Sequence, residues 1–159
     1  QFAQGIAPDA DLVAIERRGE RPTVVAHRTR DEERRYIQQA IEKFSSGGYR
    51  TMGIICKSPK QADELHQALS TELPGVHLLN ARSTAFAQGA VVCSVHLAKG
   101  LEFDQVLVPE VTDENYGTAL ERNLLYVACT RAMHALVLTH VGTATRFLPE
   151  GTLYDPGCP

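Results

Sequence analysis

The stretch of sequence that decides the fold reads Ser94-Val95-His96-Leu97-Ala98-Lys99-Gly100-Leu101-Glu102-Phe103-Asp104. Apolar runs at residues 90–93 and 106–109 flank it. Both runs are short, continuous and rich in valine, which is typical of strands that are buried on both faces of a parallel sheet. The polar stretch therefore lies where one buried strand ends and the next begins, and open α/β sheets bind ligands at strand ends.

Strongly polar side chains are concentrated in this stretch, whereas a simple connector would favour Gly, Asn, Asp and Pro. They are Ser94, His96, Lys99, Glu102 and Asp104. Their concentration makes the stretch a candidate functional site rather than a plain link between two strands.

A second stretch, residues 121–132, has the spacing of an amphipathic helix. Its apolar face is predicted to carry Leu120, Leu124, Val127 and Ala128. The helix leads into an apolar run at residues 135–138, which we expect to be another buried strand. Arg131 falls at the junction, where its planar guanidinium can project into a crevice and bind phosphate.

The first half of the chain alternates strands with helices. Strands are predicted at residues 23–27, 52–56 and 76–79. One helix begins at a capping box of Thr29 and Glu32, and the next begins at Ser58, with Pro59 and Gln61 after it. This rhythm favours right-handed crossovers and an α/β fold of three layers, in which helices cover both faces of a parallel sheet.

Together the two polar stretches resemble motifs V and VI of superfamily 1 helicases, the UvrD/Rep/RecD group. The first reads Ser-x-His-x-x-Lys-Gly-Leu-Glu-Phe, and the second reads Leu-x-Tyr-Val-x-x-Thr-Arg-Ala. The resemblance is strong over residues 90–141 and weak elsewhere. It implies the C-terminal RecA-like motor domain of an ATP-driven DNA helicase or translocase. The short connection at residues 80–89, where UvrD and Rep carry an accessory domain, makes the chain more similar to RecD-like or HelD-like proteins.

The resemblance also implies roles for particular residues. Arg131 would act as an arginine finger on the γ-phosphate of ATP, and Glu102 would bind the ribose. The remaining positions would be Lys99, Gly100 and Thr130 at the nucleotide, and Ser94 and His96 at the nucleic-acid backbone.

Each of these residues also has a simpler interpretation. Arg131 would offset the helix dipole at a helix C-terminus, and Glu102 would be a solvated charge. His96 would be a loop histidine. Lys99 would pair with Glu102 or Asp104 instead of contacting phosphate. Gly100 would satisfy a backbone requirement.

No Gly-x-x-x-x-Gly-Lys-Ser/Thr loop occurs in the sequence, so the chain is predicted to lack its own P-loop. ATP with Mg²⁺ would then be held mainly by an N-terminal RecA-like domain of the same protein, and the isolated chain would be inactive. The expected partners are that domain, single-stranded DNA and, if the protein is HelD-like, RNA polymerase. The alternative is a degenerate motor domain that acts as a protein-interaction module, for example on RNA polymerase.

Length and composition set the remaining bounds. The chain of 159 residues is expected to be a piece of a longer protein, with a lead-in segment at 1–22, the motor domain at 23–141 and a tail at 142–159. Its net charge of −3 argues against a free-standing DNA-binding module. The cysteines have no metal-binding spacing, so we expect no metal site and a reducing, cytoplasmic setting. No apolar run has membrane-spanning length, so no membrane partner is expected.

Overall fold

The computed structural model describes residues 2–6, 20–83, 88–149 and 153–155. In these residues a seven-stranded sheet has the order β3-β4-β2-β5-β6-β1-β7, and neighbouring strands pair in parallel. The strands are β1 (Thr23–His27), β2 (Thr51–Cys56), β3 (His77–Leu78), β4 (Gly89–Ser94), β5 (Phe103–Val108), β6 (Ala132–Val141) and β7 (Leu153–Asp155). The helices are α1 (Phe2–Ile6), α2 (Arg30–Ser45), α3 (Pro59–Ser70), α4 (Val95–Ala98) and α5 (Ala119–Cys129).

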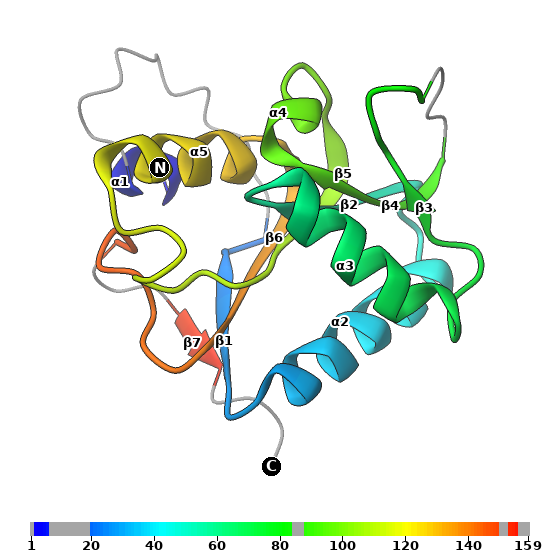
Figure 1. The fold of residues 1–159 in the computed structure, drawn as a ribbon, viewed down its shortest axis with the longest axis horizontal. Coiled ribbons are helices and arrows are strands. Elements are labelled where there is room, and N and C mark those ends of the chain that lie inside the picture. The colour runs from blue at the N-terminus through cyan, green and yellow to red at the C-terminus, as the bar shows by residue number, and fades with distance from the viewer. Residues whose placement is uncertain (1, 7–19, 84–87, 150–152, 156–159) are drawn as a thin grey trace.

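Helices cover both faces of the sheet, which confirms the predicted three-layer α/β architecture (Figure 1). One apolar cluster joins α1, α4 and α5 to the sheet. The other joins α2 and α3 to it. Strand residues alternate between the two clusters: in β4, Val91 and Cys93 belong to the first, and Ala90 and Val92 belong to the second. The sheet is therefore buried on both sides, as its continuous apolar runs indicated.

The two helices that cover one face of the sheet, α2 and α3, each begin at a capping residue. The hydroxyl of Ser58 accepts from the main-chain N–H of Gln61, and the Gln61 side chain accepts from the Ser58 N–H, which is the predicted capping box of α3. At α2 the Thr29 hydroxyl accepts from the Glu32 N–H, as predicted. The carboxylate of Glu32 instead accepts from the N–H of Arg28, one residue before the cap, so the predicted box at α2 is incomplete.

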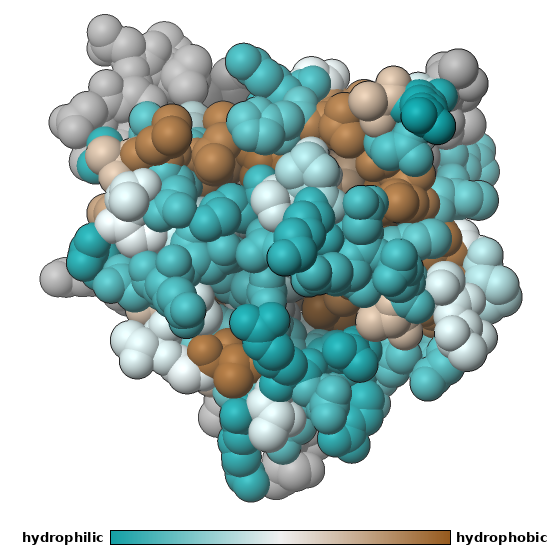
Figure 2. All heavy atoms as spheres, in the orientation of Figure 1, coloured by the Kyte–Doolittle hydropathy of each residue, from teal (hydrophilic) through white to brown (hydrophobic). Residues whose placement is uncertain are grey.

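The predicted apolar face of α5 needs correction. Leu120 is 71% exposed, although it was assigned to the buried face. The buried stripe runs through Leu125, Ala128 and Cys129. Leu120 lies roughly 140° around the helix from Leu125, at 100° per residue, so both cannot face the sheet. Apolar surface gathers over α5 in the space-filling view (Figure 2).

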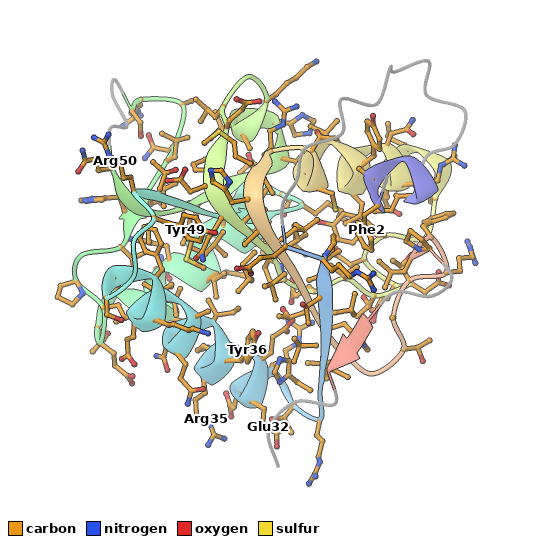
Figure 3. The ribbon with its side chains drawn as sticks, turned by 180° about the vertical axis from the view of Figure 1, so that it is seen from behind. Phe2, Glu32, Arg35, Tyr36, Tyr49 and Arg50 are labelled. Carbon is orange, nitrogen blue, oxygen red and sulfur yellow. The ribbon has the colours of Figure 1, made fainter. Side chains whose placement is uncertain are left out.

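Both flanking segments contribute to the folded unit. Ile6 of α1 is buried against the cluster that contains α5, and Phe2 packs against the same cluster (Figure 3). At the other end of the chain, β7 pairs in parallel with β1 and extends the sheet. The folded unit therefore extends beyond residues 23–141 at both ends. Residues 7–19 of the expected lead-in segment lie outside the described residues.

Candidate functional site

The connection between β4 and β5 crosses from one edge of the sheet to the other. Ser94 ends β4 at the carboxyl edge, where the strands end, and Phe103 begins β5 at the amino edge, where they begin. Both strands flank β2 in parallel, so α4 and residues 99–102 return the chain across the sheet. The polar residues of this stretch are therefore divided between two edges instead of forming one cluster.

Arg131 is the centre of the group at the amino edge. It lies between α5 and β6, and its guanidinium donates from Nη1 to the carbonyl of Leu101 at 3.4 Å and from Nη2 to the Thr130 hydroxyl at 3.1 Å. Its own carbonyl accepts from the N–H of Phe103 at 2.9 Å. The two sequence stretches thus meet at this residue. The guanidinium bonds to the β4–β5 connection, and not to the carbonyls at the end of α5.

The side chain of Arg131 keeps unused donors. Its Nε is buried and has no hydrogen-bond partner among the described residues. Thr130, whose hydroxyl accepts from Arg131, donates in turn to the carbonyl of Val127 at 2.7 Å. A guanidinium that is held by neutral acceptors, and not neutralised by a carboxylate, suits an incoming anion such as phosphate.

Lys99, Gly100 and Glu102 are exposed on the loop beside Arg131. The backbone of Gly100 is left-handed, with φ of 90°, which confirms that glycine meets a backbone requirement there. This loop and Arg131 form what we call the amino-edge group: Lys99, Gly100, Glu102, Thr130 and Arg131.

Asp104 has a structural role next to this group. Its carboxylate accepts from the N–H groups of Arg50 and Thr51, at 2.8 and 3.0 Å, and from the Thr51 hydroxyl at 3.2 Å. Burial alone would raise the pKa of this carboxyl, but the hydrogen bonds from Arg50 and Thr51 hold the pKa below its usual value. Asp104 therefore fastens the beginning of β2 to β5.

Ser94 and His96 lie near the carboxyl edge. Ser94 is 1% exposed, and its hydroxyl neither caps α4 nor has another hydrogen-bond partner among the described residues. His96, two residues further along, is exposed. Of the two, only His96 reaches the surface in this conformation.

A lysine–glutamate pair at the carboxyl edge was missed by the sequence interpretation. Lys57 Nζ donates to the carbonyl of Asn115 at 2.6 Å and to Oε1 of Glu121 at 2.9 Å. Oε2 of Glu121 accepts from the N–H groups of Gly117 and Thr118. The hydrogen bond from Lys57 and then those from Thr118 and Gly117 lower the pKa of Glu121 to about 2. The local signal that could have indicated this glutamate is the Thr-x-x-Glu spacing of Thr118 and Glu121, which is typical of a capping box.

A buried carboxylate was missed as well. Glu33 of α2 is 4% exposed and accepts from the Thr139 hydroxyl at 2.6 Å and from the N–H of Glu110 at 3.0 Å. Glu110 has a left-handed backbone, with φ of 55°, and pairs with Arg30 at 2.7 Å. Burial raises the pKa of Glu110. Arg30, Glu33 and Glu110 line a cavity between α2, α3 and the ends of β2 and β5.

Metal ligands and membrane-spanning helices are absent from the part of the chain that the structure describes. It contains no cluster of three or more His, Cys, Asp or Glu side chains that would hold a metal ion. Cys56, Cys93 and Cys129 are buried free thiols, and burial raises the pKa of Cys93 to about 12. No described helix has the length and apolar character needed to cross a bilayer.

Comparison with known proteins assigns the chain to a family. Residues 89–139, from β4 into β6, match the model of the UvrD-like helicase C-terminal domain. The crystal structure of the C-terminal domain of a possible DNA helicase from Lactobacillus plantarum WCFS1 is 32% identical, with a TM-score of 0.76 over 99% of this chain and 93% of that one. The chain belongs to the UvrD-like helicase C-terminal domains.

The UvrD-like assignment confirms the RecA-like fold expected from the motifs. The matched range contains the whole amino-edge group together with Ser94 and His96. The helicase of PRRSV shares the fold at 10% identity, with a TM-score of 0.50 over 86% of this chain and 30% of that chain. No curated protein matches the chain in sequence.

Proposed function

We propose that this helicase C-terminal domain is the second motor domain of a cytoplasmic, ATP-dependent DNA helicase or translocase. ATP would bind between the amino-edge group and an N-terminal RecA-like domain that carries the P-loop. The observation that supports this most directly is the arrangement of Arg131, a half-buried guanidinium that is fixed by Leu101 and Thr130 and keeps donors to spare.

Within this proposal Arg131 stabilises charge on the transferring γ-phosphoryl group. The equatorial oxygens of that group gain negative charge in the transition state, and a fixed guanidinium binds them more strongly there than in the ground state. Glu102 binds the ribose hydroxyls. Lys99 is a second cation near the phosphates, and Thr130 keeps the arginine in place.

The residues at the amino edge fit the anionic phosphates of ATP better than they fit Mg²⁺. Asp104, the carboxylate next to the group, is already occupied by Arg50 and Thr51. The Mg²⁺ ligands would therefore come from the P-loop domain, and this chain would supply charge neutralisation and orientation.

Single-stranded DNA is the proposed partner of the carboxyl edge. His96 is the exposed candidate there, whereas Ser94, the buried residue that ends β4 just before α4, does not reach the surface in this conformation. Because the chain has a net charge of −3, the isolated domain should bind DNA poorly, and added salt should weaken binding further by counterion release.

The direct test compares nucleic-acid-stimulated ATPase activity in two samples: the complete protein and residues 1–159 alone. The complete protein should hydrolyse ATP faster when single-stranded DNA is added, and residues 1–159 should show no hydrolysis above background. Turnover by residues 1–159, or a complete protein that shows none, would contradict the proposal. The latter result would favour the interaction-module alternative, with RNA polymerase as a partner to examine.

A further inference from the structure

Gly100 occupies a backbone conformation that side chains rarely adopt, and packing does not explain why it is glycine. Its φ is 90°, and a Cβ added there would meet nothing within 4 Å. Glycine therefore suits the shape of the turn at this position, and no close approach of another group requires it.

That turn sets the direction of the next carbonyl. The N–H of Leu101 donates back to the carbonyl of Ala98 at 2.9 Å, which closes the turn across Gly100. With its N–H directed back to α4, Leu101 presents its carbonyl to Nη1 of Arg131 at 3.4 Å. A right-handed residue at position 100 would redirect this carbonyl.

The two sequence neighbours of Glu102 both make main-chain hydrogen bonds to the same arginine, Arg131. On its N-terminal side the Leu101 carbonyl accepts from the guanidinium, and on its C-terminal side the Phe103 N–H donates to the Arg131 carbonyl at 2.9 Å. The residue proposed to bind ribose and the residue proposed to bind the γ-phosphate are thus joined through main-chain atoms.

We propose that the left-handed turn at Gly100 fixes the position of Arg131 relative to Glu102. The distance between the residue that binds the ribose and the residue that binds the γ-phosphate is then constant. This inference rests on the proposed function and deepens it. A nucleotide that is correctly seated at its ribose then presents its γ-phosphate to an arginine already in place. Loss of the turn should lower turnover and also weaken discrimination at the ribose, because both depend on the same loop.

The test is Gly100→Ala in the complete protein, with Gly89→Ala as the matched control. Gly89, at the start of β4, has φ of 99° and equally open space around a new Cβ, so the two substitutions impose similar backbone strain. The expected result is a similar loss of thermal stability in both variants. In Gly100→Ala alone, kcat should fall by about tenfold or more, and the preference for ATP over 2′-deoxy-ATP in kcat/KM should shrink.

A double-mutant cycle separates this inference from the proposed function. In an Arg131→Ala background, Gly100→Ala should change kcat little, because the group that the turn positions is already gone. If Arg131→Ala abolishes turnover but Gly100→Ala behaves like Gly89→Ala, the positioning role is wrong and the proposed function stands. If Arg131→Ala keeps normal turnover, the proposed function itself fails.

Thr130 provides a further readout on the same arginine. Thr130→Ser keeps the hydroxyl that accepts from Nη2, and Thr130→Val removes it with little change in size. Near-normal kcat in the serine variant and reduced kcat in the valine variant would support positioning by hydrogen bonds. Equal activity of the two variants would contradict it.

Discussion

Lys57 and Glu121 are far apart in the sequence, yet their side chains meet at 2.9 Å where β2 ends and α5 begins. The carboxylate also closes the capping box of α5 and accepts from Gly117. One residue therefore joins the end of a strand, the loop before α5 and the first turn of that helix. Its ionised form is the one that the fold stabilises.

Glu121→Gln should therefore lower the free energy of unfolding at pH 7, by about 1–2 kcal/mol after allowing for solvent screening of a pair that is partly exposed. The folded-state pKa is about 2, below the ordinary value of 4.5, so this stabilisation is present above pH 4.5 and is lost as the pH falls toward 2. Urea denaturation of the wild-type and variant chains at several pH values measures the difference.

The control for that prediction is Glu64→Gln, because Glu64 pairs with Lys60 on the surface at 3.8 Å with both side chains exposed. It should change stability by less than about 0.5 kcal/mol. A Glu121→Gln deficit that persists undiminished at pH 2 would show that the lost contribution is not that of the ionised carboxylate.

At the scale of elements, the side chain of Phe103, at the start of β5, packs so closely against β2 that it leaves no room for a side chain at position 53. A Cβ on Gly53 would lie 2.7 Å from Cδ2 of Phe103, whose side chain is fully buried. Phe103 also donates its N–H to Arg131. The packing of two central strands and the position of the amino-edge group therefore depend on the same contact.

Gly53→Ala should destabilise the chain by about 1–3 kcal/mol, since a fully buried aromatic ring has little room to move. Gly48→Ala is the control, because a Cβ there meets nothing within 4 Å and the backbone is not left-handed. Chemical denaturation compares the two. Equal stability of both variants would show that the ring can shift without cost.

Helix α1 supplies a second test at this scale. Ile6→Ala should cost about 1–3 kcal/mol, less than a central core truncation because a helix of five residues can detach. Hydrogen exchange should then speed up in α5, which α1 covers. Leu120→Ala, on the exposed side of α5, should stay within about 0.5 kcal/mol of the wild type. A large effect of Leu120→Ala would restore the original assignment of the helix face.

For the whole molecule, the sequence predicted most of the architecture because its signals are local. Short continuous apolar runs located the strands, and capping residues located the beginnings of helices. Strand β1 has the predicted bounds of 23–27. The prediction of the buried face of α5 was wrong because Leu120 fits the helical period but lies outside the row of residues that packs against the sheet. Periodicity cannot say which of two adjacent faces a neighbour covers.

The candidate site was only partly predictable for a related reason. The motifs placed the polar residues in the sequence, but sheet topology decides which of them meet. Parallel pairing of β4 and β5 with β2 sends Ser94 and Glu102 to opposite edges. Contacts such as Glu33 with Thr139 and Lys57 with Glu121 join distant segments and leave no local pattern.

The central claim is that Arg131 is a catalytic arginine, and the turnover number of Arg131→Ala in the complete protein tests it most directly. Arginine fingers contribute about 10³–10⁵ in turnover, so kcat for DNA-stimulated ATP hydrolysis should fall by at least about a hundredfold, even if another arginine shares the charge. Arg131→Lys should recover little, because an ammonium cannot reproduce the planar fork. Arg34→Ala, an exposed arginine on α2, is the control and should keep normal turnover. Arg131→Ala should show this loss with an unchanged melting temperature; near-normal turnover, or an unfolded domain, would contradict the catalytic role of Arg131.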